Sequence, residues 1–186
     1  DGRTEEVAAD YFLISTGSKP RDFPDIEIDQ TRIFNSDGIL NLKEFPKRLV
    51  IIGAGIVGCE YATIFSNFRK TKVYLVDHQE RIIPFEDQDV SSFISHKLVE
   101  NGVEIFHSAI LRAINKRQDH LEVILDFSDG HSEVVEADAA LISIGRVPAL
   151  SGLNLEQVDI QRNKMGFLDC DENCLIKGNV YAAGDV

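Results

Sequence analysis

Three glycines and one aspartate in this sequence have the types and spacing of a dinucleotide site. Gly53, Gly55 and Gly58 form a G-x-G-x-x-G pattern, and Asp77 follows the first glycine by 24 positions. In such a pattern the first glycine makes a tight turn, the second lets the backbone approach a pyrophosphate, and the third lets a helix pack closely on a strand. Free N–H groups at the start of that helix attract phosphates. We therefore expect a nucleotide pyrophosphate at this turn.

The flanking residues predict the elements that must position these four residues. An uninterrupted apolar run at residues 49–52 predicts a parallel strand, Arg48–Ile52, that is buried on both faces. A helix over about residues 55–68 follows, with a small apolar face formed by Cys59, Ala62, Thr63, Phe65 and Ser66. The alternating segment Lys72–Val76 predicts a second strand that ends at Asp77.

Asp77 sets the expected choice of nucleotide. At the tip of the second strand, its carboxylate can accept hydrogen bonds from the adenosine ribose hydroxyls. The same negative charge would repel a 2′-phosphate, which favours NAD over NADP. His78 and Arg81 lie close enough in sequence to weaken this exclusion. The alternative is a glycine turn in an α/β core without a ligand, and the context of strand, helix and acid argues against it.

The remaining pattern predicts more of the same sheet and an antiparallel addition. Residues 7–15 predict a strand, Pro20 and Pro24 exclude regular structure after it, and residues 22–45 form a connection. Pro148 should end regular structure near the other end. Between these limits we expect a helix over 87–101, a strand at 103–106, a meander of strands at 110–116, 121–127 and 134–137, and a return to the buried sheet at 139–144.

Composition limits the partners. A chain of 186 residues with 44% hydrophobic composition can hold one full domain and part of another. Its net charge of −12, without a dense basic run, indicates that nucleic acid is not a partner. No apolar run has the length of a bilayer span, so we expect no membrane contact and a cytoplasmic location. The chain begins without methionine and ends at AAGDV, which we interpret as cuts through a longer protein.

Other chemistry has little support in the sequence. Cys170 and Cys174 lie in an acidic segment, whereas a redox-active thiol needs a positive environment. The five histidines have no metal-ligand spacing, so we expect no metal site. Nothing resembles a nucleophile elbow or a P-loop lysine, which leaves hydrolysis and phosphoryl transfer unsupported. Glu60 is expected to face inward on the first helical turn, either to complement the helix dipole or to contact a cofactor.

Four motifs in order resemble one enzyme family. STG at residues 15–17, GAGIVGCE at 53–60, SIGRVP at 143–148 and AAGDV at 182–186 resemble the pyridine nucleotide-disulfide oxidoreductases, the family of dihydrolipoamide dehydrogenase and glutathione reductase. Within it, NSDGILNL at 35–42 and GCEYATIF at 58–65 look most like the soluble pyridine nucleotide transhydrogenases, with dihydrolipoamide dehydrogenase next. The resemblance implies a homodimeric flavoprotein that passes hydride between a nicotinamide nucleotide and FAD.

The resemblance also implies a place for each ligand. The residues near NAD would be Gly55, Ile56 and Val57 at the pyrophosphate, Asp77 at the ribose, Glu60 near the nicotinamide and flavin, and Gly145 beside the nicotinamide. The residues near FAD would be Thr16, Gly17, Arg146 and Gly184, with Asp185 at the ribityl chain. We therefore expect an α/β architecture, in which a Rossmann-like parallel sheet with a three-stranded meander at 33–147 lies between partial FAD-binding pieces at 1–32 and 148–186.

The sequence also departs from the family pattern. The N-terminal FAD fingerprint, the redox-active cysteine pair and the C-terminal dimerisation domain lie outside these residues, and Arg69 to Thr71 replaces the usual glycine-containing turn. We expect this chain alone to be inactive, because hydride transfer requires the remainder of the FAD and dimerisation domains. Two alternatives stay open: a disulfide reductase such as dihydrolipoamide dehydrogenase, and a non-catalytic NAD-sensing domain.

Overall fold

The computed structural model describes residues 4–186, which divide into two compact units. The larger unit is Pro20–Gly145, and the smaller unit combines the described residues up to Lys19 with Arg146–Val186. The chain therefore passes between the units twice, and the larger unit is an insertion within the smaller one. At the two ends of the larger unit, the Arg21 N–H donates to the Gly145 carbonyl at 3.0 Å.

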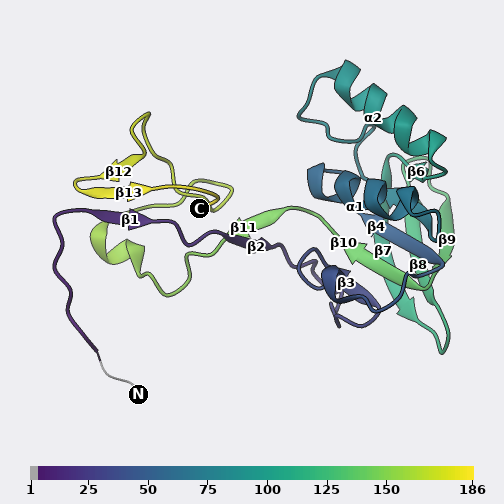
Figure 1. The fold of residues 1–186 in the computed structure, drawn as a ribbon, viewed down its shortest axis with the longest axis horizontal. Helices are drawn as coiled ribbons and strands as arrows, with labels where there is room; N and C mark the ends of the chain where they lie inside the picture. Colours follow the sequence, from purple (N-terminus) through teal and green to yellow (C-terminus); the bar gives the residue numbers. More distant parts are fainter. Residues whose placement is uncertain (1–3) are drawn as a thin grey trace. The chain divides into compact units, whose positions relative to one another are not determined.

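A five-stranded parallel sheet forms the centre of the larger unit (Figure 1). Its strands, in spatial order, are β3 (Ile33–Asn35), β10 (Ala139–Ile142), β4 (Arg48–Ile52), β5 (Lys72–Val76) and β6 (Glu104–Phe106). One face packs against helices α1 (Ile56–Asn67) and α2 (Gln88–Glu100). The other face packs against the antiparallel meander β7 (Ala109–Lys116), β8 (Leu121–Phe127) and β9 (Ser132–Ala137).

The central strand β4 is apolar after Arg48 because both of its faces are covered. In β4, Leu49 and Ile51 pack into the core beneath the helices, whereas Val50 and Ile52 pack into the core beneath the meander. All four are at most 5% exposed. This alternation between two cores confirms the expectation of a parallel strand buried on both faces.

Most expected elements of the larger unit are confirmed, and the errors have physical reasons. The two strands that flank the glycine turn have their predicted bounds, and the ends of both helices fall within one residue of prediction. The prediction of an irregular connection at 22–45 was wrong, because this segment contains β3 and the 3-10 helix η1 (Ile39–Asn41). Three residues of strand are too few to produce a visible period. In the absence of a glycine, Arg69 ends α1 in the left-handed conformation, at φ +52.

The smaller unit is a three-stranded sheet with its own core. Its strand order is β1 (Phe12–Ile14), β13 (Val180–Ala182) and β12 (Leu175–Lys177), in which β1 is parallel and β12 antiparallel to β13. The predicted strand at 7–15 was therefore too long. Pro20 was expected to exclude regular structure, yet it ends β2 (Ser18–Pro20), which pairs with β11 (Arg146–Pro148). The 3-10 helix η2 (Leu155–Val158) completes this unit.

Within residues 4–186, no helix combines the length and the apolar character needed to cross a bilayer.

Asp29 holds the segment that enters β3. Its Oδ1 accepts hydrogen bonds from the backbone N–H groups of Thr31, Arg32 and Ile33 at 2.8–2.9 Å. Its Oδ2 lies 2.8 Å from Lys116 Nζ on β7. Burial would raise the pKa of Asp29, but the Lys116 ammonium and the three N–H groups outweigh it and hold the pKa well below the ordinary 3.8. The ionised carboxylate therefore stabilises the folded state.

We expect Asp29→Asn to lower the free energy of unfolding by about 1 kcal/mol at neutral pH, because an amide oxygen still accepts the backbone N–H groups but loses the Lys116 ion pair. A depressed folded-state pKa means that this stabilisation is present above the unfolded pKa of 3.8 and is lost as the pH falls below it. Urea unfolding at neutral and acidic pH should show a shrinking difference between the two proteins.

Glu27→Gln is the matched control for Asp29, since Glu27 also lies 3.3 Å from Lys116 Nζ but its side chain is 85% exposed. We expect it to change stability by less than about 0.5 kcal/mol. A loss in Asp29→Asn that stays constant from neutral to acidic pH would contradict the role given to its charge.

Candidate nucleotide-binding site

The three glycines of the turn between β4 and α1 have three different surroundings. Gly53 has φ +99, and a Cβ there would lie 2.5 Å from the Ser143 carbonyl oxygen. A Cβ at Gly58 would lie 1.9 Å from the Gly53 carbonyl oxygen, whereas a Cβ at Gly55 would meet no atom within 4 Å. The tight turn at Gly53 and the close packing at Gly58 are therefore confirmed. The open space at Gly55 is what an approaching pyrophosphate requires.

The start of α1 presents backbone donors beside this open space. Gly55 is the N-cap, without a side-chain cap, and the first helical hydrogen bond runs from the Cys59 N–H to the Gly55 carbonyl at 3.0 Å. The N–H groups of residues 55–58 precede that bond, so they remain available to a ligand. Ile56 is 64% exposed, which leaves the helix end accessible. Donors and helix dipole together make an anion site.

Asp77 lies against the same turn, directly after β5. It is 7% exposed, its Oδ2 accepts the Ala54 N–H at 2.5 Å, and its Oδ1 accepts the Gln79 N–H at 2.9 Å. Its Oδ1 is also 3.2 Å from Nδ1 of His78. The structure thus brings Asp77 to the glycine turn and gives both oxygens partners in the chain. A carboxylate has about four lone-pair positions, so Asp77 can accept further hydrogen bonds.

Two hollows lie at the carboxyl ends of the strands. A cavity of about 220 Å³ is lined by Gly53, Asp77 and His78 on one side and by Ile110 of β7 on the other. His78 and Ile110 also line a neighbouring hollow of about 670 Å³, whose walls are partly polar. In open α/β sheets, ligands bind outside the carboxyl ends of the strands. These hollows therefore extend the candidate site from the glycine turn past Asp77 and His78.

Arg81 lines the larger hollow, but its guanidinium is turned toward its own loop. Its Nη2 and Nη1 donate to the carbonyls of Pro84 and Glu86 at 2.6 and 2.8 Å. His78 and Arg81 are the two residues expected to weaken the exclusion of a 2′-phosphate. Of these two described residues, only His78 contacts Asp77.

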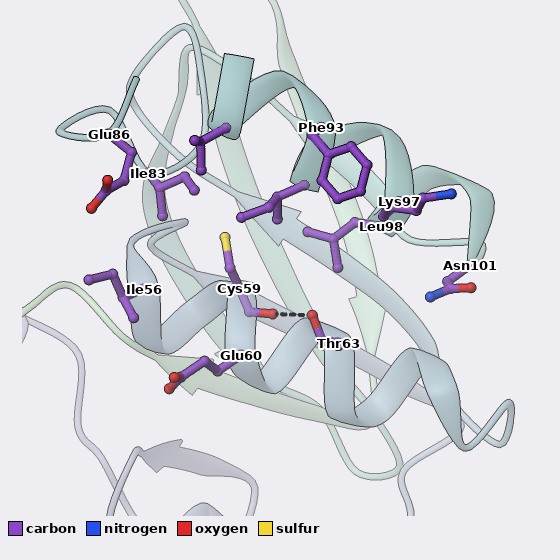
Figure 2. Close-up of a pocket in the computed structure, with 12 residues that line it drawn as sticks. Ile56, Cys59, Glu60, Thr63, Ile83, Glu86, Phe93, Lys97, Leu98 and Asn101 are labelled. Atoms are coloured by element: carbon purple, nitrogen blue, oxygen red, sulfur yellow. Dashed lines mark hydrogen bonds between the residues drawn. The ribbon is translucent and has the colours of Figure 1, made fainter. Parts of the chain in front are cut away.

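Cys59, not Glu60, faces the interior of the unit. Cys59 is 6% exposed, and its Sγ lies 3.5 Å from the Ala54 carbonyl oxygen. Burial, followed by the charges of Asp77 and Glu60, raises the pKa of its thiol to about 12. Figure 2 shows Glu60 pointing from α1 away from α2. The expected inward orientation of Glu60 was wrong, because position 59 and not 60 falls on the buried stripe of the helix.

A mainly apolar cleft of about 410 Å³ separates α1 from α2, with Cys59, Ile83 and Phe93 among its walls (Figure 2). The cleft exists because only part of the apolar face of α2 is buried. Leu98 is 2% exposed, but Phe93 is 64% exposed. The amphipathic pattern predicts the helix correctly and does not reveal that Val90, Phe93 and Val99 stay exposed.

The residues expected near FAD in the smaller unit come from both ends of the chain. Arg146 Nε and Nη2 donate to the hydroxyl and the carbonyl of Ser18 at 2.6 and 2.7 Å. The Ser18 hydroxyl bonds to Asp185, whose carboxylate is 3.6 Å from Arg146 Nε. Gly17 and Gly184, at φ +71 and +85, both have open space where a Cβ would be. The sequence did not single out Ser18, although it directly follows the STG motif.

Thr16 and Gly145 are two other expected residues near the cofactors. Thr16 is exposed beside Gly17. Gly145, in the larger unit, has φ +106, and a Cβ there would lie 3.9 Å from the Arg21 side chain.

Ser143, directly after β10, contacts the turn and was not assigned a role from the sequence. Its hydroxyl lies 2.9 Å from the carbonyl oxygens of both Ile52 and Gly53 and so joins β10 to the turn. The signals for it were its place at the end of a buried strand and as the first residue of the SIGRVP motif.

A parallel sheet, a glycine turn that opens a helix, and an acid at the tip of the next strand together define a dinucleotide-binding α/β protein. The chain belongs to the pyridine nucleotide-disulphide oxidoreductase family, whose sequence profile matches residues 1–186. The resemblance drawn from its four motifs is thereby confirmed.

Known proteins similar to this chain include enzymes of two names. It is 38% identical over its whole length to a soluble pyridine nucleotide transhydrogenase of Stutzerimonas stutzeri, of which it covers 39%. It is 36% identical, over 94% of its length, to a dihydrolipoyl dehydrogenase of Bacillus subtilis, of which it covers 37%. The chain thus spans about two-fifths of the length of these relatives.

Two solved structures have a fold similar to that of this chain. LpdA from Mycobacterium tuberculosis matches 99% of the chain with a TM-score of 0.87 and 32% identity, and the match covers 39% of LpdA. The HOCl-induced flavoprotein disulfide reductase RclA from Escherichia coli matches 96% of the chain with a TM-score of 0.82 and 32% identity, over 40% of its own length.

Proposed function

We propose that this chain is the nicotinamide-nucleotide-binding part of a flavin-dependent oxidoreductase, with the activity of a soluble pyridine nucleotide transhydrogenase. The observation that carries the proposal is the open space at Gly55, bordered by free N–H groups of α1 and by Asp77. The transhydrogenase relative, at 38% identity over the whole chain, supports this particular activity.

The proposed role of these residues is to hold the nucleotide. The backbone donors of residues 55–58 balance the charge of the pyrophosphate, and Asp77 accepts hydrogen bonds from the adenosine ribose. Glu60 and Gly145 border the nicotinamide, as the family resemblance implies. When bound, the nicotinamide and the flavin carry the hydride chemistry themselves. The chain thus contributes position and orientation, which lower the barrier by fixing the reacting groups in place.

The proposed division of labour between the units follows the same resemblance. Residues 33–147 form the nucleotide-binding domain, and residues 1–32 and 148–186 are parts of an FAD-binding domain. The open space where a Cβ would be at Gly17 and at Gly184, next to Asp185, has room for such a ligand, which supports this assignment. We propose further that the intact protein is a cytoplasmic homodimer completed by the remaining FAD and dimerisation domains.

NAD is the proposed nucleotide, with NADP as the weaker ligand. The buried carboxylate of Asp77 would repel a 2′-phosphate, and Arg81 is engaged by its own loop. Titration calorimetry with NADH and NADPH tests this choice, and equal affinity for the two would contradict the role given to Asp77.

Dihydrolipoamide dehydrogenase is the second candidate activity, favoured by the Bacillus subtilis relative. The intact protein, loaded with FAD, should be assayed both with dihydrolipoamide and with NADPH plus an NAD analogue. Hydride transfer between the two nucleotides supports the transhydrogenase. Activity only with dihydrolipoamide supports the dehydrogenase. Nucleotide binding without either activity supports a non-catalytic NAD-sensing domain.

A further inference from the structure

Two peptide groups connect helix α2 to the glycine turn through hydrogen bonds. The hydroxyl of Ser91, on α2, donates to the Ile82 carbonyl at 2.7 Å. The N–H of Ile83, which belongs to the same peptide group, donates to the Ala54 carbonyl at 2.7 Å. All four residues are buried, with exposures between 0 and 5%. A hydroxyl on α2 is thereby linked to the middle of the turn.

The direction of each link follows from peptide geometry. In a planar trans peptide, the C=O and the N–H point in opposite directions. The peptide group between Ile82 and Ile83 therefore accepts on the side of Ser91 and donates on the side of Ala54. The next peptide group accepts through the Ala54 carbonyl, so its own N–H, that of Gly55, points away from Ile83. That N–H is one of the free donors at the start of α1.

Neighbouring contacts fix the peptide groups of Ile83 and Ala54, which lie in the middle of this series of hydrogen bonds. Ile83 has φ +38, a left-handed conformation that is costly for a β-branched residue and persists only where neighbouring contacts impose it. The Ala54 N–H is fixed on its other side by Asp77 Oδ2 at 2.5 Å. Ala54 is thus held through both its N–H and its carbonyl. Successive hydrogen bonds also polarise one another, which strengthens the last donor of the chain.

We propose that Ser91 is a positioning residue for nucleotide binding. Its hydroxyl orients the peptide group of Ile82 and Ile83, that group orients the peptide of Ala54 and Gly55, and the Gly55 N–H is thereby directed at the pyrophosphate. Ser91 does not touch the ligand, and it lies 36 positions beyond Gly55 in the sequence. This inference rests on the proposed nucleotide function.

Ser91→Ala in the intact protein tests the proposal. We expect the dissociation constant for NADH, measured by fluorescence titration, to rise about 3- to 10-fold, the effect of one neutral hydrogen bond. ADP-ribose should lose affinity by the same factor, because it has the pyrophosphate and lacks the nicotinamide. The kcat at saturating nucleotide should stay within about twofold, so that the loss falls on KM.

Two further variants separate positioning from a general loss of packing. Ser66→Ala removes another buried hydroxyl, 4% exposed, which donates to the Thr63 carbonyl at 3.2 Å on α1 and makes no hydrogen bond to the turn. It should leave the affinity for NADH within about twofold of wild type. Ser91→Thr keeps the hydroxyl and should restore most of the affinity that Ser91→Ala loses.

The outcomes are distinguishable. If wild-type protein binds NADH and Ser91→Ala binds it equally well, the positioning role is overturned and the proposed function stands. An equal loss in Ser66→Ala, or no recovery in Ser91→Thr, also overturns the positioning role. If wild-type protein binds neither NADH nor NADPH, both proposals fail.

Discussion

Gly58→Ala is expected to lower the free energy of unfolding by about 3 kcal/mol. The added Cβ would lie 1.9 Å from the Gly53 carbonyl oxygen and 3.0 Å from the Ser143 hydroxyl. Neither neighbour can move away at little cost, because the carbonyl is part of the turn and the hydroxyl bonds to it at 2.9 Å. Helix α1 would have to move off β4. Chemical denaturation of the intact protein measures the loss.

Gly55→Ala is the matched substitution two positions into the same motif. A Cβ at Gly55 meets nothing within 4 Å, and its φ of −73 suits alanine, so the free energy of unfolding should fall by less than about 1 kcal/mol. The affinity for NADH should nevertheless fall by about tenfold or more, because the methyl group occupies the approach of the pyrophosphate. Undiminished binding of NADH by Gly55→Ala would contradict the site, whatever happens to Gly58→Ala.

Asp77→Asn is expected to affect both stability and nucleotide choice. Asp77 accepts one backbone N–H on each oxygen, and an amide has only one oxygen. One buried N–H, of Ala54 or of Gln79, would therefore face an NH₂ group, at a cost of about 1–3 kcal/mol. NADH should bind more weakly, and its advantage over NADPH should shrink because the repelling charge is gone. Denaturation and calorimetric titration measure the two effects separately.

His78→Gln is the control for Asp77→Asn. The His78 side chain is 69% exposed and contacts the same carboxylate, so its replacement should change stability by less than about 0.5 kcal/mol. Full stability together with an unchanged NADH-to-NADPH ratio in Asp77→Asn would remove Asp77 from both of its roles.

The parts of the site that could be predicted from sequence are those with local physical causes. The glycine spacing is dictated by a turn and a helix contact within six residues, and Asp77 is placed by the end of a strand with a clear pattern. Glu60 was misplaced because its orientation was inferred from its nearness to Gly58, whereas the helix buries the face that contains Cys59 and Ala62. The strand β3 was not predicted, because its three residues, two of them buried, are too few to show a hydrophobic period.

Other features depend on contacts between distant parts of the chain. The Ala54 N–H reaches Asp77 only when β4 and β5 pair, and the link from Ser91 to Ala54 arises only when α2 and the loop before it pack against the turn. No spacing rule contains them. Arg146, Ser18 and Asp185 meet from opposite ends of the sequence, and family motifs pointed to two of these three.

The hydrogen bond between the Arg21 N–H and the Gly145 carbonyl has a consequence for how such proteins can be rearranged. It holds Arg21 and Gly145, at the two ends of the larger unit, side by side, so that the chain enters and leaves the proposed nucleotide-binding part at adjacent points. Such a segment behaves as a cassette, since exchanging it for that of a relative requires only two adjacent joints. Nucleotide preference could then be transplanted as a block, without rebuilding the unit that carries the chain ends.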